Sequence, residues 1–342
     1  MSVSTYLHHF FVSNLLTLYY SGLVLLGFLW SYVKNPFADP WAQKLRLEPP
    51  PCLTDTKYGV HKYIKVNNTK LHYVESGDPS KPLMVFLHGF PEFWYSWRHQ
   101  ITEFNKDYWC IAIDMRGYGD SERPDGLEAY DLKQLVEDVR DLIRQLGREK
   151  CVLVAHDWGG LIACRFRDVH PDALSALVVL ASTSQEAWYH ELWGSDEQRK
   201  KSWYVFFYRM PGLAEKLLRM NDMAAFDTVM RVPGKDTITT QDIECFKYWF
   251  GKPTALTPPI NYYRSNFAYT LADKPRCERP VPFLYALAQN DAYLSTTLID
   301  KMKNYYAHIE PTIIENCGHF AQQEEPAKVN SLIRNFLSKH KV

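Results

Sequence analysis

This chain of 342 residues lacks an excess of charge of either sign, because 39 Lys and Arg balance 39 Asp and Glu. A balanced chain offers no broad electrostatic attraction to nucleic acid or to another polyanion, so neither is expected as a partner. The sequence also lacks internal repeats and low-complexity tracts. Its length suits one large domain with an insertion, or two small domains.

Paired cysteines are also missing. The seven cysteines are scattered, with no CxxC and no Cys/His spacing of the kind that binds metal. An odd number of scattered cysteines is more typical of free thiols in a reducing compartment than of a disulfide framework. The cysteine pattern therefore predicts no metal centre.

Charged side chains are absent from residues 1–33. The apolar stretch 10–33 has 24 residues, and a membrane-spanning helix needs roughly 20. A cleaved signal peptide is the alternative, but it would need a basic start and a shorter core. The length of the stretch and its missing basic start therefore predict a single-pass anchor over 1–34. Because Lys34, Lys44 and Arg46 follow the stretch and no Lys or Arg precedes it, the positive-inside rule places the C-terminal side in the cytosol. Residues 10–33 would contact the lipid bilayer, expected to be that of the endoplasmic reticulum, with the rest of the chain in the cytosol.

Apolar runs typical of buried parallel strands follow a proline-rich linker at 35–58. LMVFLHG (83–89), WCIAIDMRG (109–117) and CVLVAHD (151–157) are continuous apolar stretches that end in small or polar residues. Helical patterns separate them, and one helix follows Asp131, which suits a capping box with Gln134. Strands that alternate with helices predict an α/β fold with a mainly parallel sheet and helices on both faces. Residues 59–183 and 276–342 would form this core.

One interval, 184–275, interrupts the alternation. It holds almost no buried-strand pattern, is rich in Trp, Tyr and Phe, and carries helix-like segments. An insertion of this kind between two core strands predicts a helical lid over the sheet.

The sharpest local signal is VAHDWGG (154–160). It has the outline of a nucleophile elbow, G-x-S-x-G, the strained strand-to-helix turn that presents a catalytic serine. Asp157 stands in place of the serine, and Gly159 and Gly160 would let the strand and the helix approach closely. Taken alone, this short pattern is weak, because Asp157 is also compatible with an N-cap for the next helix.

Further candidates follow other predicted strands at the same edge of the sheet. HGFPE (88–92) is placed as an oxyanion loop, Asp291 ends the strand 281–289, and His319 follows the last strand. The chain order of nucleophile, acid and histidine is that of α/β-hydrolases. Together these positions favour a catalytic Asp157.

HGFPE, DMRGYGDS (114–121), HDWGG (156–160), AQNDAY (288–293) and CGHF (317–320) together resemble the epoxide hydrolase branch of the α/β-hydrolases. The resemblance covers roughly 60–340, and an anchor followed by such a domain is similar to the membrane-bound epoxide hydrolases of animals. That family presents two lid tyrosines to the epoxide oxygen. WYVFFYRMPG (203–212) gives Tyr204, with Tyr208 as the alternative in the same segment, and NYYR (261–264) gives Tyr263.

The chemistry explains a carboxylate at the elbow. A serine attacking an epoxide carbon would leave an ether, whereas Asp157 would leave an ester that water can hydrolyse. His319, oriented by Asp291, would activate that water. The backbone N–H groups of Phe90 and Trp158 would hold the oxyanion. The expected partners are an apolar epoxide and water, without a cofactor.

Two other functions stay open. A haloalkane or haloacid dehalogenase would use the same aspartate and ester but needs no donor to an alkoxide, so the tyrosine pair and Phe90 favour the epoxide. A non-catalytic binding protein of this fold should have lost one of the catalytic groups. Glu92 and Asp114 are expected to hold loops by hydrogen bonds.

Overall fold

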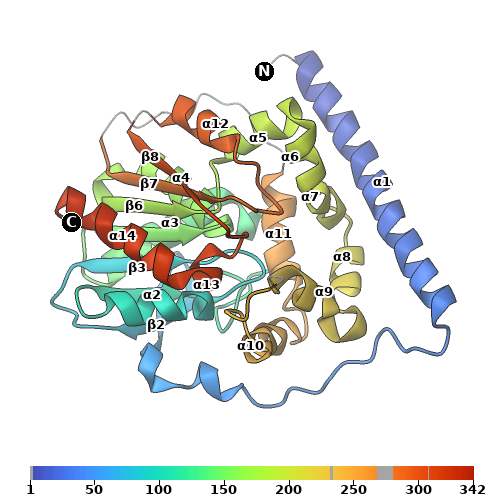
Figure 1. The fold of residues 1–342 in the computed structure, drawn as a ribbon, viewed down its shortest axis with the longest axis horizontal. Helices are drawn as coiled ribbons and strands as arrows, with labels where there is room; N and C mark the ends of the chain where they lie inside the picture. Colours follow the sequence, from blue (N-terminus) through green and yellow to red (C-terminus); the bar gives the residue numbers. More distant parts are fainter. Residues whose placement is uncertain (1–2, 232–233, 268–279, 307) are drawn as a thin grey trace.

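The computed structural model describes residues 3–231, 234–267, 280–306 and 308–342. Within these residues a single eight-stranded sheet runs in the order β1-β2-β4-β3-β5-β6-β7-β8 (Figure 1). Strand β2 is antiparallel to β1 and β4, and every other neighbouring pair is parallel. The predicted α/β fold is confirmed. The strands are β1 (Val60–Val66), β2 (Thr69–Ser76), β3 (Leu83–Leu87), β4 (Trp109–Ile113), β5 (Cys151–His156), β6 (Leu174–Leu180), β7 (Phe283–Ala288) and β8 (Ile309–Ile314).

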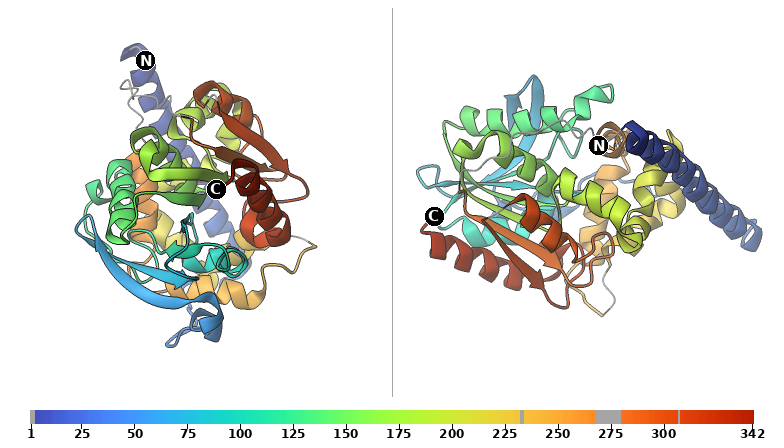
Figure 2. Two further views of the ribbon diagram at one scale, coloured as in Figure 1. Left: turned by 90° about the vertical axis from the view of Figure 1, so that its left-hand side faces the viewer. Right: turned by 90° about the horizontal axis from the view of Figure 1, so that it is seen from above.

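Helices cover both faces of the sheet (Figure 2). Helix α2 packs with α14 on one face, and α3 packs with α4 on the other. The core helices are α2 (Arg98–Phe104), α3 (Leu132–Gln145), α4 (Trp158–Val169), α12 (Leu298–Tyr305), α13 (Ala321–Glu324) and α14 (Pro326–His340).

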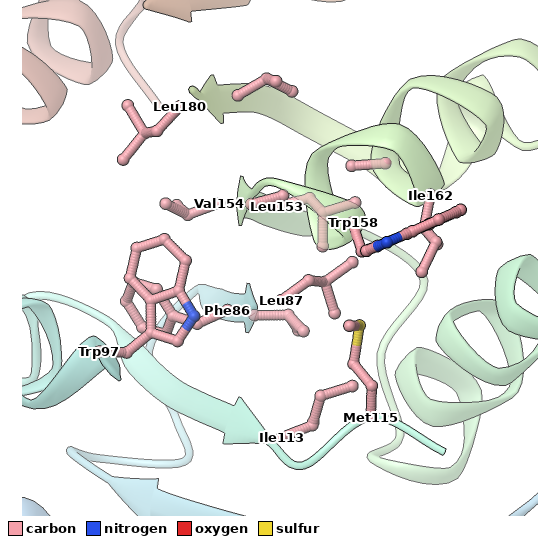
Figure 3. Packing of buried hydrophobic residues seen from close by; sticks show 14 of the residues in the cluster. Phe86, Leu87, Trp97, Ile113, Met115, Leu153, Val154, Trp158, Ile162 and Leu180 are labelled. Atoms are coloured by element: carbon pink, nitrogen blue, oxygen red, sulfur yellow. The ribbon is translucent and has the colours of Figure 1, made fainter. Parts of the chain in front are cut away.

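The central strands read as unbroken apolar runs because both of their faces are covered. Every residue of β3, β4 and β5 is buried. Figure 3 shows how Phe86 and Leu87 of β3 lie beside Leu153 and Val154 of β5 in this core. The close packing fixes the carboxyl ends of these strands, from which the candidate site is built.

The capping box predicted for α3 is wrong. Asp131 occupies the N-cap position, but its side chain makes no hydrogen bond to the helix. Instead Asn266 accepts the N–H of Leu132 at 2.8 Å, and Ser265 donates to the carboxylate of Asp131 at 3.0 Å. Gln134 accepts from Asn67 at 3.1 Å. A side chain from a distant helix therefore replaces the local cap.

Seven helices lie between β6 and β7 in the described part of the chain, where no strand interrupts them. This lid covers the carboxyl ends of the strands (Figure 1). The predicted lid boundary at 275 and 276 lies outside the described residues. The lid helices are α5 (Gln185–Gly194), α6 (Asp196–Lys201), α7 (Trp203–Tyr208), α8 (Leu213–Leu218), α9 (Met220–Met230), α10 (Thr240–Phe250) and α11 (Thr257–Asn266).

Helix α1 (Val3–Lys34) packs along the outer side of the lid, chiefly against α7 (Figures 1 and 2). Its buried side chains are polar ones at every fourth position: Ser13, Thr17 and Ser21. The guanidinium of Arg209, next to α7, donates to Thr17 at 3.1 Å. The opposite face of α1 exposes large apolar side chains, among them Leu15, Leu18 and Leu26. Residues Leu7–Lys34 are long and apolar enough to cross a membrane.

The segment after α1 lies on the lid. Residues 39–53, called the strap below, run along α9 and α10 before the chain enters β1. The N–H of Asn221 donates to the carbonyl of Pro40 at 2.8 Å, and Arg46 pairs with Asp222 at 2.6 Å and with Glu244 at 3.1 Å. The predicted linker is thus fixed to the lid along much of its length.

Candidate active site

Asp157 is the single residue between the end of β5 and the start of α4. Its backbone has φ 49° and ψ −119°, a sparsely populated conformation that costs on the order of 1–3 kcal/mol and is found at functional sites. A Cβ on Gly159 would come within 2.3 Å of the carbonyl oxygen of Leu87, and one on Gly160 within 2.4 Å of Ser182 Cβ. Both positions therefore need glycine, because β5 and α4 approach their neighbours too closely for a side chain.

The two carboxylate oxygens of Asp157 have different surroundings. Oδ1 accepts the backbone N–H of Phe90, from the HGFPE loop, at 2.8 Å. Oδ2 lies 3.6 Å from His319 Nε2. Burial would raise the pKa of Asp157, but the hydrogen bond and charge of His319 and the Phe90 N–H together hold that pKa below its ordinary value. The carboxylate is therefore ionised at neutral pH, with one oxygen held and the other turned toward the histidine.

The backbone N–H of Trp158, the second expected oxyanion donor, makes no hydrogen bond to any described residue. It is the first N–H group of α4, where no intrahelical acceptor is available. The donor is thus unused beside the carboxylate of Asp157.

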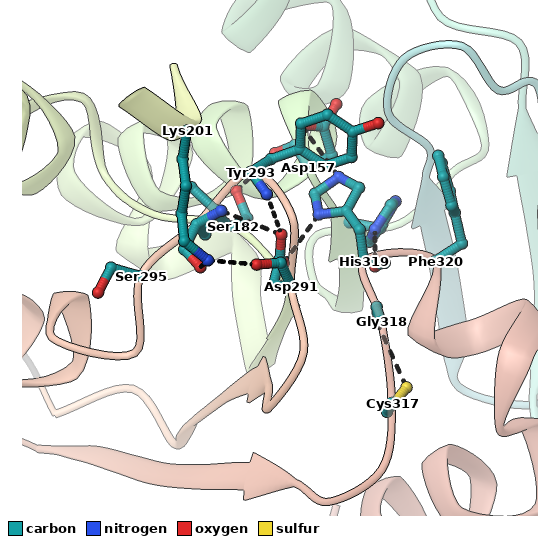
Figure 4. A network of polar contacts seen from close by, with 12 residues as sticks. Asp157, Ser182, Lys201, Asp291, Tyr293, Ser295, Cys317, Gly318, His319 and Phe320 are labelled. Atoms are coloured by element: carbon teal, nitrogen blue, oxygen red, sulfur yellow. Dashed lines mark hydrogen bonds and ion pairs between the residues drawn. The ribbon is translucent and has the colours of Figure 1, made fainter. Parts of the chain in front are cut away.

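His319 and Asp291 form a buried pair on neighbouring loops (Figure 4). His319 Nδ1 lies 2.8 Å from Asp291 Oδ2. The other oxygen, Oδ1, accepts the backbone N–H groups of Tyr293 at 2.7 Å and Leu294 at 3.0 Å. Burial acts to lower the pKa of His319, but the carboxylates of Asp291 and Asp157 outweigh it and raise the pKa to about 10. The imidazole therefore carries a proton while both carboxylates are charged.

Glu92 links the loops that carry these groups. It is fully buried and accepts the N–H of Gly89 at 2.9 Å. It also pairs at 2.7 Å with His156, whose other ring nitrogen lies 2.9 Å from the carbonyl of His319. Asp114 similarly accepts backbone N–H groups of Trp94 and Asp120 at 2.9 and 3.0 Å. Both acids hold loops, as expected.

Two chambers meet at the elbow. The larger has a volume of about 290 Å³ and the smaller about 60 Å³. Asp157, Tyr204 and Tyr263 line both, whereas Tyr208 lines the larger one alone. This distinction favours Tyr204 over Tyr208 as the first lid tyrosine.

Both tyrosines line this space beside Asp157. The Tyr204 and Tyr263 rings lie 5.9 Å apart between centroids, and Trp158 packs edge-on against Tyr263 at 5.0 Å. Neither hydroxyl has a hydrogen-bond partner among the described residues. Burial first, and then the charge of Asp157, raise the pKa of both phenols well above the ordinary value. The phenols therefore stay protonated at neutral pH and are free to donate to a bound molecule.

Tyr293 is a site residue that the sequence analysis missed. Its ring lies 4.8 Å from that of His319 and 5.3 Å from that of Tyr204, and it lines the larger chamber. The available signal was its place two residues after Asp291, in AQNDAY. It packs between the predicted base and a predicted donor.

Comparison with known proteins shows to which family the chain belongs. Residues 82–326 match the α/β-hydrolase fold family. Epoxide hydrolase 3 of Xenopus tropicalis is 39% identical over 300 residues, covering 84% of this chain and 80% of the relative. Epoxide hydrolase 4 of Mus musculus is 36% identical over 323 residues, covering 92% of this chain and 89% of the relative.

Solved structures agree with these relatives. A mutant epoxide hydrolase from Bacillus megaterium, complexed with its diol product, superposes with a TM-score of 0.74 at 31% identity and covers 81% of this chain and 100% of that one. Epoxide hydrolase VrEH1 from Vigna radiata gives a TM-score of 0.72 at 27% identity, covering 83% and 99%. With its elbow, its buried acid–histidine pair and these relatives, the chain belongs to the α/β-hydrolase family, in the group of the animal epoxide hydrolases, and is a hydrolase.

Proposed function

We propose that this enzyme hydrolyses apolar epoxides to vicinal diols through a covalent ester on Asp157. One observation carries the proposal: an ionised carboxylate, that of Asp157, lines the same cavity as two protonated tyrosines, Tyr204 and Tyr263. An epoxide needs these two functions together, a nucleophile for its carbon and a proton donor for its oxygen.

In the first step, Asp157 Oδ2 attacks an epoxide carbon while its partner oxygen stays bonded to the Phe90 N–H. The carbon–oxygen bond of the ring breaks and the negative charge moves to the epoxide oxygen. Tyr204 and Tyr263 donate hydrogen bonds to this oxygen, and one of the two phenols passes its proton to it. The proton that His319 releases once the ester has formed restores that phenol. Pre-placed donors of this kind each contribute roughly 10²–10³-fold in rate.

In the second step, His319 removes a proton from water, which attacks the acyl carbon of Asp157. The geometry suggests when the base becomes active. Ester formation removes the negative charge of Asp157, one of the two carboxylates that keep the His319 pKa high. The pKa of His319 must then fall, so that a neutral base becomes available once the ester exists. Oδ1 becomes the oxyanion and is held by the N–H groups of Phe90 and Trp158. Collapse of this intermediate breaks the ester bond between the acyl carbon and Oδ2, and His319 returns the proton to the departing diol oxygen.

The substrate class follows from the lining of the chambers. The smaller chamber is bounded by Leu161, Trp188 and Phe267, and the larger by Phe207, Leu218 and Val229. These side chains favour an apolar substrate, because transfer of apolar surface from water is worth about 25 cal/mol per Å². An epoxide with an apolar group on each side of the ring would place one group in each chamber.

A substrate panel tests this function. The purified chain should convert lipid epoxides to diols and release no halide from haloalkanes of matched length. The physical reason is that a halide leaves without taking up a proton, so a dehalogenase would not need the two phenols as proton donors. Halide release in the absence of diol formation would contradict the proposal and favour the dehalogenase.

We further propose that α1 anchors the enzyme in a membrane through residues 10–33, with the catalytic domain in the cytosol. The absence of charge before Lys34 and the exposed apolar face of α1 support this topology, which requires that the helix leaves its contacts with the lid at Ser13, Thr17 and Ser21 when it enters the bilayer. Protease added to sealed microsomes should digest the catalytic domain, while an epitope tag placed before Met1 should survive until detergent is added. Protection of the domain would contradict the orientation, and digestion of the tag would contradict the crossing.

A further inference from the structure

Two thiols meet where the strap crosses the lid. Cys52 lies in a short helical turn, Pro51–Leu53, and Cys245 lies on α10. Their sulfur atoms are 2.6 Å apart, although the two residues are 193 positions apart in the sequence. A disulfide bond is about 2.05 Å long. The chain therefore brings the two sulfurs almost to bonding distance by its ordinary fold.

The two thiols differ in access to solvent. Cys52 is partly exposed, whereas Cys245 is buried. Hydrogen bonds from Cys245 and then from Tyr95 lower the pKa of Cys52 to about 7, against the effect of burial. The reactive species in thiol chemistry is the thiolate. Cys52 is thus suited to react with an oxidant from solution. Cys245, which is buried beside it, is suited to attack the oxidised Cys52 sulfur in a second step.

The surroundings of this pair connect the lid to the core. The hydroxyl of Tyr95 donates to Asp242 on α10 at 2.9 Å, and Arg98 lies 3.3 Å from the same carboxylate. The rings of Phe93 and Phe246 are in edge contact at 5.2 Å. Phe93 directly follows the HGFPE loop. Strap, lid and core therefore meet within a few side chains of Cys52 and Cys245.

We propose that Cys52 and Cys245 form a reversible disulfide that fastens the strap to the lid. With a small disulfide such as oxidised glutathione, the Cys52 thiolate attacks one sulfur and releases one glutathione thiolate. The Cys245 thiol then loses its proton, attacks the Cys52 sulfur of the mixed disulfide and releases the second glutathione. Two protein thiols are oxidised, one small disulfide is reduced to two thiols, and one sulfur–sulfur bond replaces another.

The link would act on the stability of the lid. In the reduced chain, polar contacts such as Arg46 with Asp222 hold the strap. A disulfide between positions 52 and 245 closes a long loop, and cross-links of long loops restrict the unfolded chain most. The oxidised chain should unfold at a midpoint roughly 5–10 °C higher than the reduced chain.

The test uses the full chain in detergent, equilibrated with mixtures of reduced and oxidised glutathione and then treated with a thiol-alkylating reagent. Oxidation should protect two thiols from alkylation and lower the intact mass by two hydrogens. Peptide mapping under non-reducing conditions should join Cys52 to Cys245. A stable glutathione adduct on Cys52, or continued alkylation of both thiols in excess oxidised glutathione, would overturn the proposal.

Single substitutions separate the pair from the other cysteines. Cys52→Ser and Cys245→Ser should each abolish the mass change and the rise in unfolding temperature. Cys110→Ala, which removes a buried thiol of β4, should keep both. A chain with Cys52→Ser that still gains stability on oxidation would show that other thiols are responsible. Because the readouts are mass and unfolding temperature, the result does not depend on the proposed reaction.

Discussion

Replacing His319 with Gln should leave the enzyme able to attack an epoxide once and unable to finish the reaction. Asp157 keeps its Phe90 hydrogen bond in this variant, so the ester can form. The hydrolytic water loses its base, and general-base catalysis is worth roughly 10²–10⁴-fold. Steady-state turnover should fall by about that factor, and the ester should accumulate to one equivalent per chain.

Intact-protein mass spectrometry checks this result. The mass of the His319→Gln variant should rise by one epoxide, and peptide mapping should locate the adduct on Asp157. Asp157→Ala is the matched control, because it removes the nucleophile and should give neither adduct nor turnover. If His319→Gln abolished alkylation as completely as Asp157→Ala does, the assignment of His319 to the second step would be wrong.

The second large effect concerns the lid tyrosines. Tyr204→Phe and Tyr263→Phe each remove one hydroxyl from a ring that lines the chambers with Asp157, and each keeps the ring in place. Each change should slow alkylation by roughly 10²-fold, the usual effect of one donor to a developing oxyanion. The double variant should be far slower than either, because the alkoxide would form without a donor. Ester hydrolysis should change little, since its oxyanion is held by backbone N–H groups.

Single-turnover measurements separate these two steps, with Tyr208→Phe as the control. Tyr208 lines the larger chamber alone, so its hydroxyl should matter much less. A silent Tyr204→Phe beside a slow Tyr208→Phe would reassign the first lid tyrosine. If both the Tyr204 and the Tyr263 changes were silent, the dehalogenase function would gain support.

The sequence was most informative where local pattern and tertiary position coincide. β3 and β5 are recognisable because they are buried on both faces, and such strands read as continuous apolar runs. The residues that follow them lie at one edge of the sheet by the geometry of a parallel fold. Phe90, Asp157 and His319 could therefore be brought together from sequence, before any side-chain distance was known.

Contacts between distant segments were not predictable in this way. The cap of α3 comes from Asn266, 134 residues further along the chain. The N-cap propensity of Asp131 gives no indication of this distant partner. The docking of α1 on the lid did leave a signal. Ser13, Thr17 and Ser21 recur every four residues on a mainly apolar helix, and such a stripe of small hydroxyl residues is typical of a face that packs on another helix.

The strap illustrates a third case. Its proline content suggested an irregular linker. Apart from the short helical turn Pro51–Leu53 the strap is irregular, yet Arg46 fixes it to the lid and Cys52 lies beside Cys245. Scattered cysteines gave no sign of a pair, because the spacing of 193 positions has no local meaning. Only the fold brings the two thiols together.

A single turnover in water labelled with heavy oxygen tests the covalent ester on Asp157 most directly. With enzyme in excess over epoxide, the new hydroxyl oxygen of the diol should come from Asp157, so the first product should be mostly unlabelled. The label should instead enter the carboxylate of Asp157, and diols formed in later turnovers should carry it. Heavy oxygen in the diol of the first turnover would mean that water attacks the epoxide directly, with Asp157 as a general base, and would contradict the mechanism.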